Sequence, residues 1–345
     1  LYGRSREKDR LVAAFERARE GSRALALLSG PAGLGKSSIS LDFYRRATDE
    51  GAFFAGGRFD AQTRDKPYSA LITAVERLIR ELLGRDESQV EVWRERLREV
   101  LGEEGRVLTD ILPHVELLLG EQPPVPDLNP ADAGRRFSRL VCRFFAAFAQ
   151  ADAPLVIALD DLHWADHSSL RLIELLLNDD RIHHLLIVGS HRGLGALDEN
   201  ESLAMMLRRI EEGAAELYLI DIGPLEVGHV NQLLVDTLGC KSEEAEPLAE
   251  LLHKKTAGNP GFLRQLLRTL SDENMLTFDG AEWRWDLEAI EARAPAESVV
   301  ALLQQKMEAL APETQGMLEL AAGIGRSFDV GTLAVLAARP VHEVA

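Results

Sequence analysis

Residues 30–37 read Gly30-Pro31-Ala32-Gly33-Leu34-Gly35-Lys36-Ser37, which fits the pattern G-x-x-x-x-G-K-[ST]. The stretch follows the apolar run Ala24–Leu28, typical of a buried strand, and precedes a helical pattern from Ser38 to Arg46. Glycines at these spacings let several backbone N–H groups converge at a helix start, where phosphate oxygens bind. The alternative is a chance glycine turn, but the strand and helix on either side favour a phosphate-binding loop. We predict that nucleotide phosphates contact Gly30, Gly33, Gly35, Lys36, Ser37 and Ser38.

Two of these side chains have predicted chemical roles. The Lys36 ammonium would act as a point charge on the β- and γ-phosphates, and its role is therefore catalytic as well as binding. The Ser37 hydroxyl would be a ligand of Mg²⁺. The expected cofactors are ATP or ADP with Mg²⁺.

A second chemical motif ends another apolar strand, Leu155-Val156-Ile157-Ala158-Leu159-Asp160-Asp161. The carboxyl ends of parallel strands share one edge of a sheet, so both carboxylates are expected beside the phosphate loop. Asp160 is the predicted partner of Ser37 at the metal. Asp161 is the predicted catalytic acid that orients or deprotonates the attacking water, although it could instead only bond the following loop. For Asp166 we favour a helix-capping role, and for His163 a structural one.

The pattern along the whole chain predicts an α/β fold, a parallel sheet flanked by helices. Helix-periodic stretches separate the predicted strands, and this alternation is typical of a parallel sheet. A helical insertion is expected at about residues 66–131, and it ends in Glu121–Pro130, where four prolines in ten residues form a stiff connector. The predicted strands are Ala24–Leu28, Ala52–Phe54, Leu155–Leu159, Leu185–Val188 and Glu216–Ile220.

Three domains are predicted. Residues 1–223 would form a phosphate-loop nucleotide-binding domain, and residues 224–275, which follow Gly223-Pro224, a small helical lid domain. Residues 276–345 begin with a predicted β-hairpin, Leu276–Phe278 and Trp283–Trp285 around Asp279-Gly280, and then become helical.

Composition excludes several classes of protein. The 345 residues include 39 Lys and Arg against 56 Asp and Glu, a net charge of −17, which disfavours a protein that coats nucleic acid. Apolar runs such as Ala153–Leu159 are too short to cross a membrane, and Cys142 and Cys240 lack metal-ligand spacing. We therefore predict a cytoplasmic protein without a membrane segment. Because the chain starts without Met and stops inside an apolar-periodic stretch, we expect it to be part of a longer protein.

These motifs together resemble those of the signal-transduction ATPases with numerous domains, the STAND class of the AAA+ superfamily. The resemblance covers nearly the whole chain and is closest to the origin-recognition-like AAA ATPase modules of large bacterial serine/threonine or hybrid histidine kinases. It is carried by the phosphate loop and by segments that read Asp160-Asp161-Leu-His-Trp-Ala-Asp166, Lys255-Thr256-Ala-Gly258-Asn259-Pro260, Gly57-Arg58-Phe59-Asp60, Arg64–Leu71 and Trp283-Arg284-Trp285.

The resemblance also implies roles for further residues. Gly3 and Arg4 match the family's opening Gly-Arg segment near the adenine, and Pro260 matches a proline that packs on the base. Arg192 matches an arginine after the fourth strand that senses the γ-phosphate, so we count it among the catalytic residues, with a solvated loop arginine as the alternative. Gly193 and Gly261 depart from the family pattern, where Asp and an aromatic residue are frequent. The Gly258-Asn259-Pro260 segment also fits an ordinary helix stop and restart.

The resemblance further implies partners. Kinase or sensor domains attached in the same parent chain are expected, and the helices after Val299 resemble the start of a winged-helix domain. Nucleotide-dependent self-association is a further possibility, in which Arg135 and Arg136 would face a neighbouring subunit's nucleotide. A solvated helix face is the alternative reading of these arginines.

Two functions fit the sequence. The first is a regulatory switch in which ATP binding and slow hydrolysis control an attached effector. The second is an origin-recognition-like or transcription-regulating AAA+ ATPase that binds DNA through its winged helix, which the net charge of −17 disfavours. Protein kinase activity of the segment itself is excluded, because the sequence has no His-Arg-Asp or Asp-Phe-Gly motif.

Overall fold

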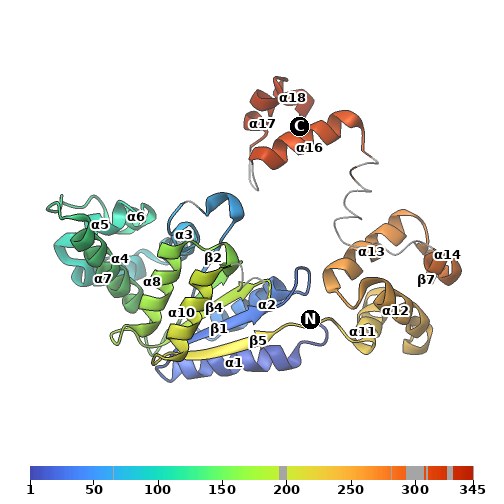
Figure 1. Cartoon of the computed structure of the whole chain (residues 1–345), viewed down its shortest axis with the longest axis horizontal. Coiled ribbons are helices and arrows are strands. Elements are labelled where there is room, and N and C mark those ends of the chain that lie inside the picture. Colours follow the sequence, from blue (N-terminus) through green and yellow to red (C-terminus); the bar gives the residue numbers. More distant parts are fainter. Residues whose placement is uncertain are drawn as a thin grey trace. The chain divides into compact units, whose positions relative to one another are not determined.

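The computed structural model describes residues 1–64, 66–193, 200–280, 282–292, 307, 310–324 and 329–344. Contacts divide the chain into two compact units, which separate between Gly223 and Pro224 (Figure 1). The first unit contains the phosphate loop and the acidic strand end. No helix in the described ranges has the length and apolar character needed to span a bilayer.

The first unit is built on a five-stranded sheet in which every neighbouring pair of strands is parallel, as the sequence predicts. The strand order is β2-β3-β4-β1-β5, so the strand before the phosphate loop lies between β4 and β5. All five strands end at one edge, which gathers the segments that follow them. The strands are β1 (Arg23–Ser29), β2 (Phe53–Arg58), β3 (Leu155–Asp160), β4 (Leu185–His191) and β5 (Glu216–Asp221).

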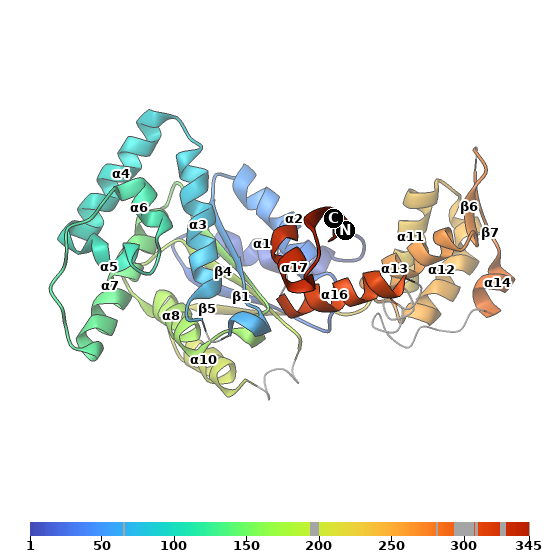
Figure 2. The same ribbon diagram turned by 90° about the horizontal axis from the view of Figure 1, so that it is seen from above.

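Helices cover both faces of this sheet (Figure 2). On one face, α1 and α2 bury apolar side chains such as Leu11, Phe15 and Ile39 against alternate residues of the strands. On the other face, a larger core includes residues of α3, α7, α8 and α10. These six helices are α1 (Ser5–Arg19), α2 (Lys36–Asp49), α3 (Ser69–Leu83), α7 (Pro130–Phe148), α8 (His167–Asn178) and α10 (Glu201–Glu211).

Strand β2 corrects one prediction, because it runs from Phe53 to Arg58 rather than ending at Phe54. Gly56 and Gly57 obscure its second half, since glycine is rare in strands. A Cβ at Gly57 would overlap the carbonyl oxygen of Ala70, so only glycine lets α3 approach β2 so closely. The longer strand carries Arg58 to the carboxyl edge of the sheet.

The segment between α3 and α7 is helical, and Figure 1 shows its helices gathered with α7 at one end of the first unit. Trp93 stacks on Phe148, with ring centroids 4.6 Å apart and an interplanar angle of 7°, which fixes α4 against α7. The proline-rich stretch before α7 has no regular structure between Gly120 and Asn129. The elements of this segment are α4 (Glu87–Leu101), η2 (Gly102–Glu104), α5 (Gly105–Thr109) and α6 (His114–Leu119). A further short helix, η1 (Ala61–Thr63), lies between β2 and α3.

The second unit has its own apolar core, which includes Val230, Leu234, Leu252, Leu263 and Leu270. An antiparallel pair of strands forms at the predicted hairpin, with Leu276 opposite Trp285. The predicted winged-helix region lies partly outside the described residues, at 293–306 and 325–328, and stays a prediction. The elements are α11 (Val227–Leu238), α12 (Ser242–Thr256), α13 (Pro260–Asp272), β6 (Leu276–Phe278), β7 (Trp283–Trp285), α14 (Leu287–Ala292), α16 (Pro312–Ile324), α17 (Val330–Ala337) and α18 (Val341–Val344).

Candidate functional site

The loop between β1 and α2 depends on glycine at three positions. Gly30, Gly33 and Gly35 have φ angles of 146°, 84° and 94°, which L side chains rarely adopt. A Cβ at Gly30 would also lie 2.6 Å from the carbonyl oxygen of Ile222. The loop leads directly into the first turn of α2. The first backbone N–H groups of a helix have no acceptor within the helix. This geometry suits an anion at the helix start.

Lys36 opens α2 and turns back over the loop. Its Nζ donates hydrogen bonds to the carbonyl oxygens of Gly30, at 2.6 Å, and Pro31, at 2.9 Å. Burial lowers the pKa of Lys36, while the carboxylates of Asp161 and Asp160 act in the opposite direction. The ammonium is thus held over the glycine loop, where a phosphate group could take the place of the two carbonyls as its partner.

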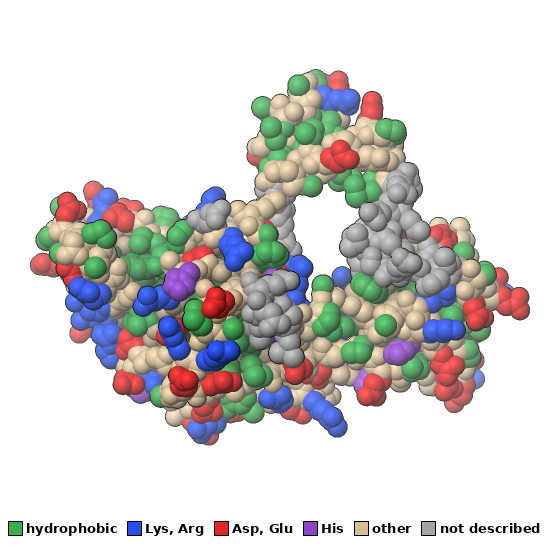
Figure 3. Space-filling view, viewed as in Figure 1, with side chains coloured by type: hydrophobic (Ala, Val, Ile, Leu, Met, Phe, Trp, Pro, Cys, Tyr) green, Lys and Arg blue, Asp and Glu red, His purple; other side chains and the backbone are tan. Residues whose placement is uncertain are grey.

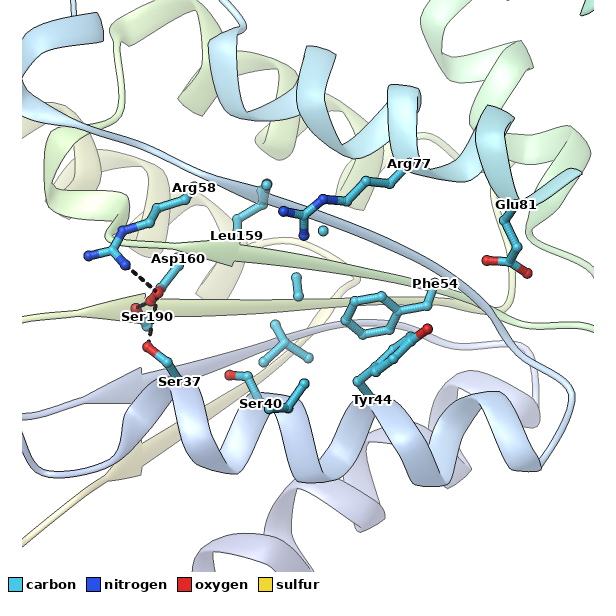
Figure 4. Close-up of a pocket in the computed structure, with 15 residues that line it drawn as sticks. Ser37, Ser40, Tyr44, Phe54, Arg58, Arg77, Glu81, Leu159, Asp160 and Ser190 are labelled. Carbon is cyan, nitrogen blue, oxygen red and sulfur yellow. Dashed lines mark hydrogen bonds and ion pairs between the residues drawn. The ribbon is translucent and has the colours of Figure 1, made fainter. Parts of the chain in front are cut away.

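Ser37 and Asp160 come together although 123 positions separate them in the chain. The Ser37 hydroxyl donates to Oδ2 of Asp160 at 2.9 Å, and the Ser190 hydroxyl donates to Oδ1 (Figure 4). A hydroxyl and a carboxylate are oxygen ligands of the kind that Mg²⁺ prefers when phosphate oxygens and waters complete its shell. The donor set therefore fits the predicted metal, and the assignment of Ser37 and Asp160 as its ligands stays a prediction.

Asp161 occupies a left-handed backbone conformation, with φ 57° and ψ 46°, at the start of the short helix η3 (Leu162–Trp164). Its N–H donates to the Ser190 hydroxyl at 3.0 Å. A non-glycine residue in this region is uncommon, and aspartate adopts it more readily than most residues. The Asp161 carboxylate is mostly buried, since only 14% of its side chain is exposed.

Arg58 is the functional residue that sequence reasoning missed. It lies beside Asp160 in the register of β2 and β3. Its Nη2 is 2.6 Å from Oδ2 of Asp161, and its Nη1 is 3.7 Å from Oδ2 of Asp160. The sequence predicts no role for Arg58 beyond its place in the segment Gly57-Arg58-Phe59-Asp60, because Gly56 and Gly57 interrupt the apolar pattern before it. Ser190, which also contacts Asp160, has no role predicted from the sequence.

Arg192 follows β4 directly, at the same edge of the sheet as Lys36 and Asp160. Its guanidinium carbon lies 6.0 Å from the ring centroid of Trp164, within cation–π range. Arg192 is exposed, and its charge acts on both Lys36 and His163. The predicted γ-phosphate sensor is therefore close to the loop, and its role stays a prediction.

His163 is buried, and neither ring nitrogen has a hydrogen-bond partner among the described residues. Burial is the largest cause that lowers its pKa; the carboxylates of Asp161 and Asp160 oppose this effect, whereas Arg192 and Lys36 reinforce it. Burial also lowers the pKa of His191 at the end of β4. The surroundings of the phosphate loop therefore favour neutral imidazoles.

Arg4 is buried and joins the start of the chain to the phosphate loop. Its Nη2 donates to the carbonyl oxygens of Leu34, at 3.1 Å, and Gly223, at 2.8 Å. Gly3 precedes it with a φ of 61°. The contact with Leu34 indicates that Arg4 positions the loop, and the adenine contact implied for Gly3 and Arg4 stays a prediction.

Two predicted caps have the expected geometry. Asp166 accepts a hydrogen bond from the N–H of Ser169 at 2.9 Å, which caps α8. Asn259 accepts from the N–H groups of Gly261 and Phe262, and Pro260 takes the first position of α13. Pro260 lies in the second unit, so its predicted packing on the base stays a prediction.

The arginines of α7 have local partners. Arg135 pairs with Asp132, Arg136 donates to the carbonyl oxygen of Pro126 at 2.9 Å, and Arg139 pairs with Glu104 at 2.6 Å. These contacts resemble a solvated helix face. The role of Arg135 and Arg136 between subunits stays a prediction without support from these contacts.

Comparison with known families agrees with the geometry. Residues 1–188, which carry the phosphate loop and the acidic strand end, match the AAA ATPase domain. The chain belongs to the AAA ATPase family. The fold of the first unit is therefore that of a phosphate-loop NTPase of the AAA class, and membership implies nucleotide binding and supports ATPase activity.

Two curated relatives of this AAA ATPase are much longer proteins. It is 27% identical to hybrid signal transduction histidine kinase G of Dictyostelium discoideum, over 98% of this chain and 12% of that protein. It is 25% identical to peroxide stress-activated histidine kinase mak2 of Schizosaccharomyces pombe, over 83% of this chain and 13% of that protein. The chain thus spans about an eighth of each relative.

Solved structures similar to this AAA ATPase include a Walker-type ATPase of Pyrococcus abyssi, with 16% identity, a TM-score of 0.46, and coverage of 93% of this chain and 78% of that one. They also include a STAND protein with a tetratricopeptide repeat sensor from Pyrococcus horikoshii. It has 14% identity, a TM-score of 0.43, and coverage of 99% of this chain and 37% of that one.

Proposed function

We propose that this AAA ATPase is an ATP-binding, slowly hydrolysing regulatory switch module of a larger cytoplasmic signalling protein, in which kinase or sensor domains are attached. The observation that carries the proposal is the convergence of Ser37 on Asp160 beside the glycine loop, with Lys36 held above that loop. The two histidine kinase relatives, which match along nearly the whole chain or most of it, support the signalling context.

The chemistry proposed for the site divides among its residues. The glycine loop and Lys36 bind the phosphates, and Ser37 and Asp160 hold Mg²⁺, which neutralises charge on the phosphate oxygens when bound. Asp161 orients or deprotonates a water, and Arg192 contacts the γ-phosphate by charge-assisted hydrogen bonds. Gly3, Arg4 and Pro260 are proposed to surround the base.

Arg58 gives a physical reason for slow turnover. Its guanidinium lies 2.6 Å from the Asp161 carboxylate, so this ion pair has to open before Asp161 can contact the attacking water. In the proposed switch, the nucleotide-bound state lasts as long as hydrolysis is slow. The switch acts on an effector only if the nucleotide binds its two states with different affinity.

The one face of the first unit that Figure 3 shows gives no support to the DNA-binding alternative. On the face of the first unit seen in Figure 3, Lys and Arg side chains are interspersed with Asp and Glu rather than gathered in one basic patch. A salt-dependent shift of a labelled duplex in the presence of the protein would favour the DNA-binding function over the switch.

The test of the proposed function is thermal unfolding with and without ATP, ADP and Mg²⁺, with phosphate release followed in the same samples. Nucleotide at 100 times its Kd should add about 2.7 kcal/mol to the free energy of unfolding. For a domain of this size, that raises Tm by roughly 5–10 °C. We expect the rise with both nucleotides, together with slow phosphate release.

Lys36→Ala should lose the nucleotide-dependent rise in Tm. Lys254→Ala is the matched control, since Lys254 is an exposed lysine of α12 in the second unit. A folded protein whose Tm does not respond to either nucleotide would overturn the proposal. Fast phosphate release would leave an ATPase but remove the slow switch.

A further inference from the structure

A cavity of about 550 Å³ extends from the proposed metal site along the face of the sheet that α2 covers. Its near end is formed by Ser37, Arg58 and Asp160, and its far end by side chains of α2, β2 and α3 (Figure 4). The volume lies in the range of small-molecule sites. The far end has no part in the chemistry proposed for nucleotide and metal. Its lining side chains are Ser40, Leu41, Tyr44, Phe54, Arg77 and Glu81.

The cavity has room because two small residues lie side by side on neighbouring strands, where larger side chains would fill the space. Gly56 of β2 is paired in register with Ala158 of β3, and both line the floor. A Cβ at Gly56 would lie 3.1 Å from Nη1 of Arg77. The buried residues of α3 belong to the core on the face of the sheet opposite α2. The Arg77 side chain therefore passes around β2, the edge strand, to reach the cavity on the α2 face.

Arg77 differs from two arginines near it, Arg80 of α3 and Arg85 just after that helix. Arg80 pairs with Glu76, and Arg85 pairs with Glu81 at 3.1 Å. Arg77 has no ion pair or hydrogen bond with any of the residues that the structure describes, and Figure 4 shows it pointing into the cavity. Arg77 is exposed, and its guanidinium is therefore available to pair with an anion that enters the cavity.

We propose that the far end of this cavity binds a small planar organic anion, whose carboxylate pairs with Arg77. The guanidinium can bind a carboxylate through two parallel hydrogen bonds. The planar body would lie over Ala158 and against Phe54, because Arg77 and Phe54 already cover Gly56. The Phe54 ring meets that of Tyr44 edge-on, with centroids 4.4 Å apart.

The test is isothermal titration calorimetry with indole-3-acetate as the probe and indole as its uncharged counterpart. We expect one site with a Kd of about 0.1–1 mM for indole-3-acetate and at least about tenfold weaker binding of indole. Arg77→Gln should weaken the binding of indole-3-acetate by at least about tenfold. Arg80→Gln, on the same helix, is the matched control and should leave the Kd unchanged. Equal binding of both probes, or unchanged binding by Arg77→Gln, would overturn the proposal.

A second variant tests the cavity without touching a charge. Ala158→Val adds two methyl groups to the floor and should also weaken binding of indole-3-acetate, whereas an unchanged Kd would contradict the assigned position. This site does not depend on the proposed ATPase function. Lys36→Ala should retain the probe and lose ATP, and Arg77→Gln should do the reverse, so a failure of either proposal is distinguishable from a failure of the other.

Discussion

Two sets of arginines in the first unit differ in their ion-pair partners. One set is Arg58 alone, and the other is the arginines of α7. Arg58 ends a strand and pairs with Asp161 and Asp160, the acids predicted to act in the site. Arg135 and Arg139 lie along α7 and pair with acids of their own surroundings, Asp132 and Glu104. The sequence predicts a role between subunits for Arg135 and Arg136 of α7, whereas it predicts none for Arg58. The comparison shows that a position at the carboxyl edge of the sheet places an arginine beside the acids of the site, whereas a group of arginines along one helix does not.

The largest effect expected from this comparison concerns the acidic partners of the two sets. Asp161→Asn should lower the rate of phosphate release by about 10²–10⁴-fold, because asparagine cannot accept the proton. Asparagine also tolerates positive φ, so the turn should persist. The measurement is single-turnover hydrolysis with nucleotide binding checked in parallel.

Glu104→Gln, which removes the partner of Arg139, is the matched control and should leave hydrolysis unchanged. If Asp161→Asn hydrolysed ATP at the original rate, Asp161 would be a structural residue of the loop, and the two sets of arginines would not differ in function.

The next effect concerns two glycines, one beside each set of arginines. Gly57→Ala should lower the free energy of unfolding by about 1–3 kcal/mol or more, because its Cβ would overlap the backbone of Ala70. Gly134→Ala should raise it by roughly 0.5–1 kcal/mol, because Gly134 lies inside α7 with open space around it. Urea denaturation measures both. A Gly57→Ala variant as stable as the original protein would contradict the tight approach of α3 to β2.

The third effect is a dependence of stability on pH. Burial lowers the pKa of His163 and His191 in the folded chain. Below about pH 6.5 the unfolded chain therefore binds protons that the folded chain does not. The free energy of unfolding should fall as the pH falls through this window, by at most about 1.4 kcal/mol per pH unit for each histidine.

His163→Gln should reduce this slope, measured by urea denaturation between about pH 7.5 and pH 5. His183→Gln, at an exposed position before β4, is the control and should keep it. An unchanged slope in His163→Gln would mean that the ring gains a proton as easily folded as unfolded.

The smallest expected effect belongs to Arg58 itself. Arg58→Ala should lower the Mg²⁺ concentration for half-maximal hydrolysis by up to about fivefold, because a positive charge near Asp160 is removed and partly exposed ion pairs contribute up to about 1 kcal/mol. Arg139→Ala should leave the Mg²⁺ dependence unchanged. A higher requirement for Mg²⁺ in Arg58→Ala would show that Arg58 supports the metal site rather than competing with it.

Much of this site could be predicted from local sequence. The glycine loop and its following helix are local features, since their spacing fixes which backbone groups converge. Asp160 and Asp161 were recognisable because an apolar strand ended in acids. Arg58 was harder to find, because Gly56 and Gly57 broke the strand pattern that leads to it. Those glycines are required by the approach of α3, a contact that no local pattern encodes.

The sequence by itself determined the parallel α/β fold, the phosphate loop and the two acids, because each depends on neighbouring residues and on the rule that parallel strands end together. Only the tertiary structure decided the strand order β2-β3-β4-β1-β5, and with it that Ser190 and Arg58 flank Asp160 from either side. It also decided that Gly56 and Ala158 leave a cavity beneath Arg77. The physical reason is that lateral pairing of strands and passage of a side chain around a sheet edge depend on packing between segments far apart in the chain.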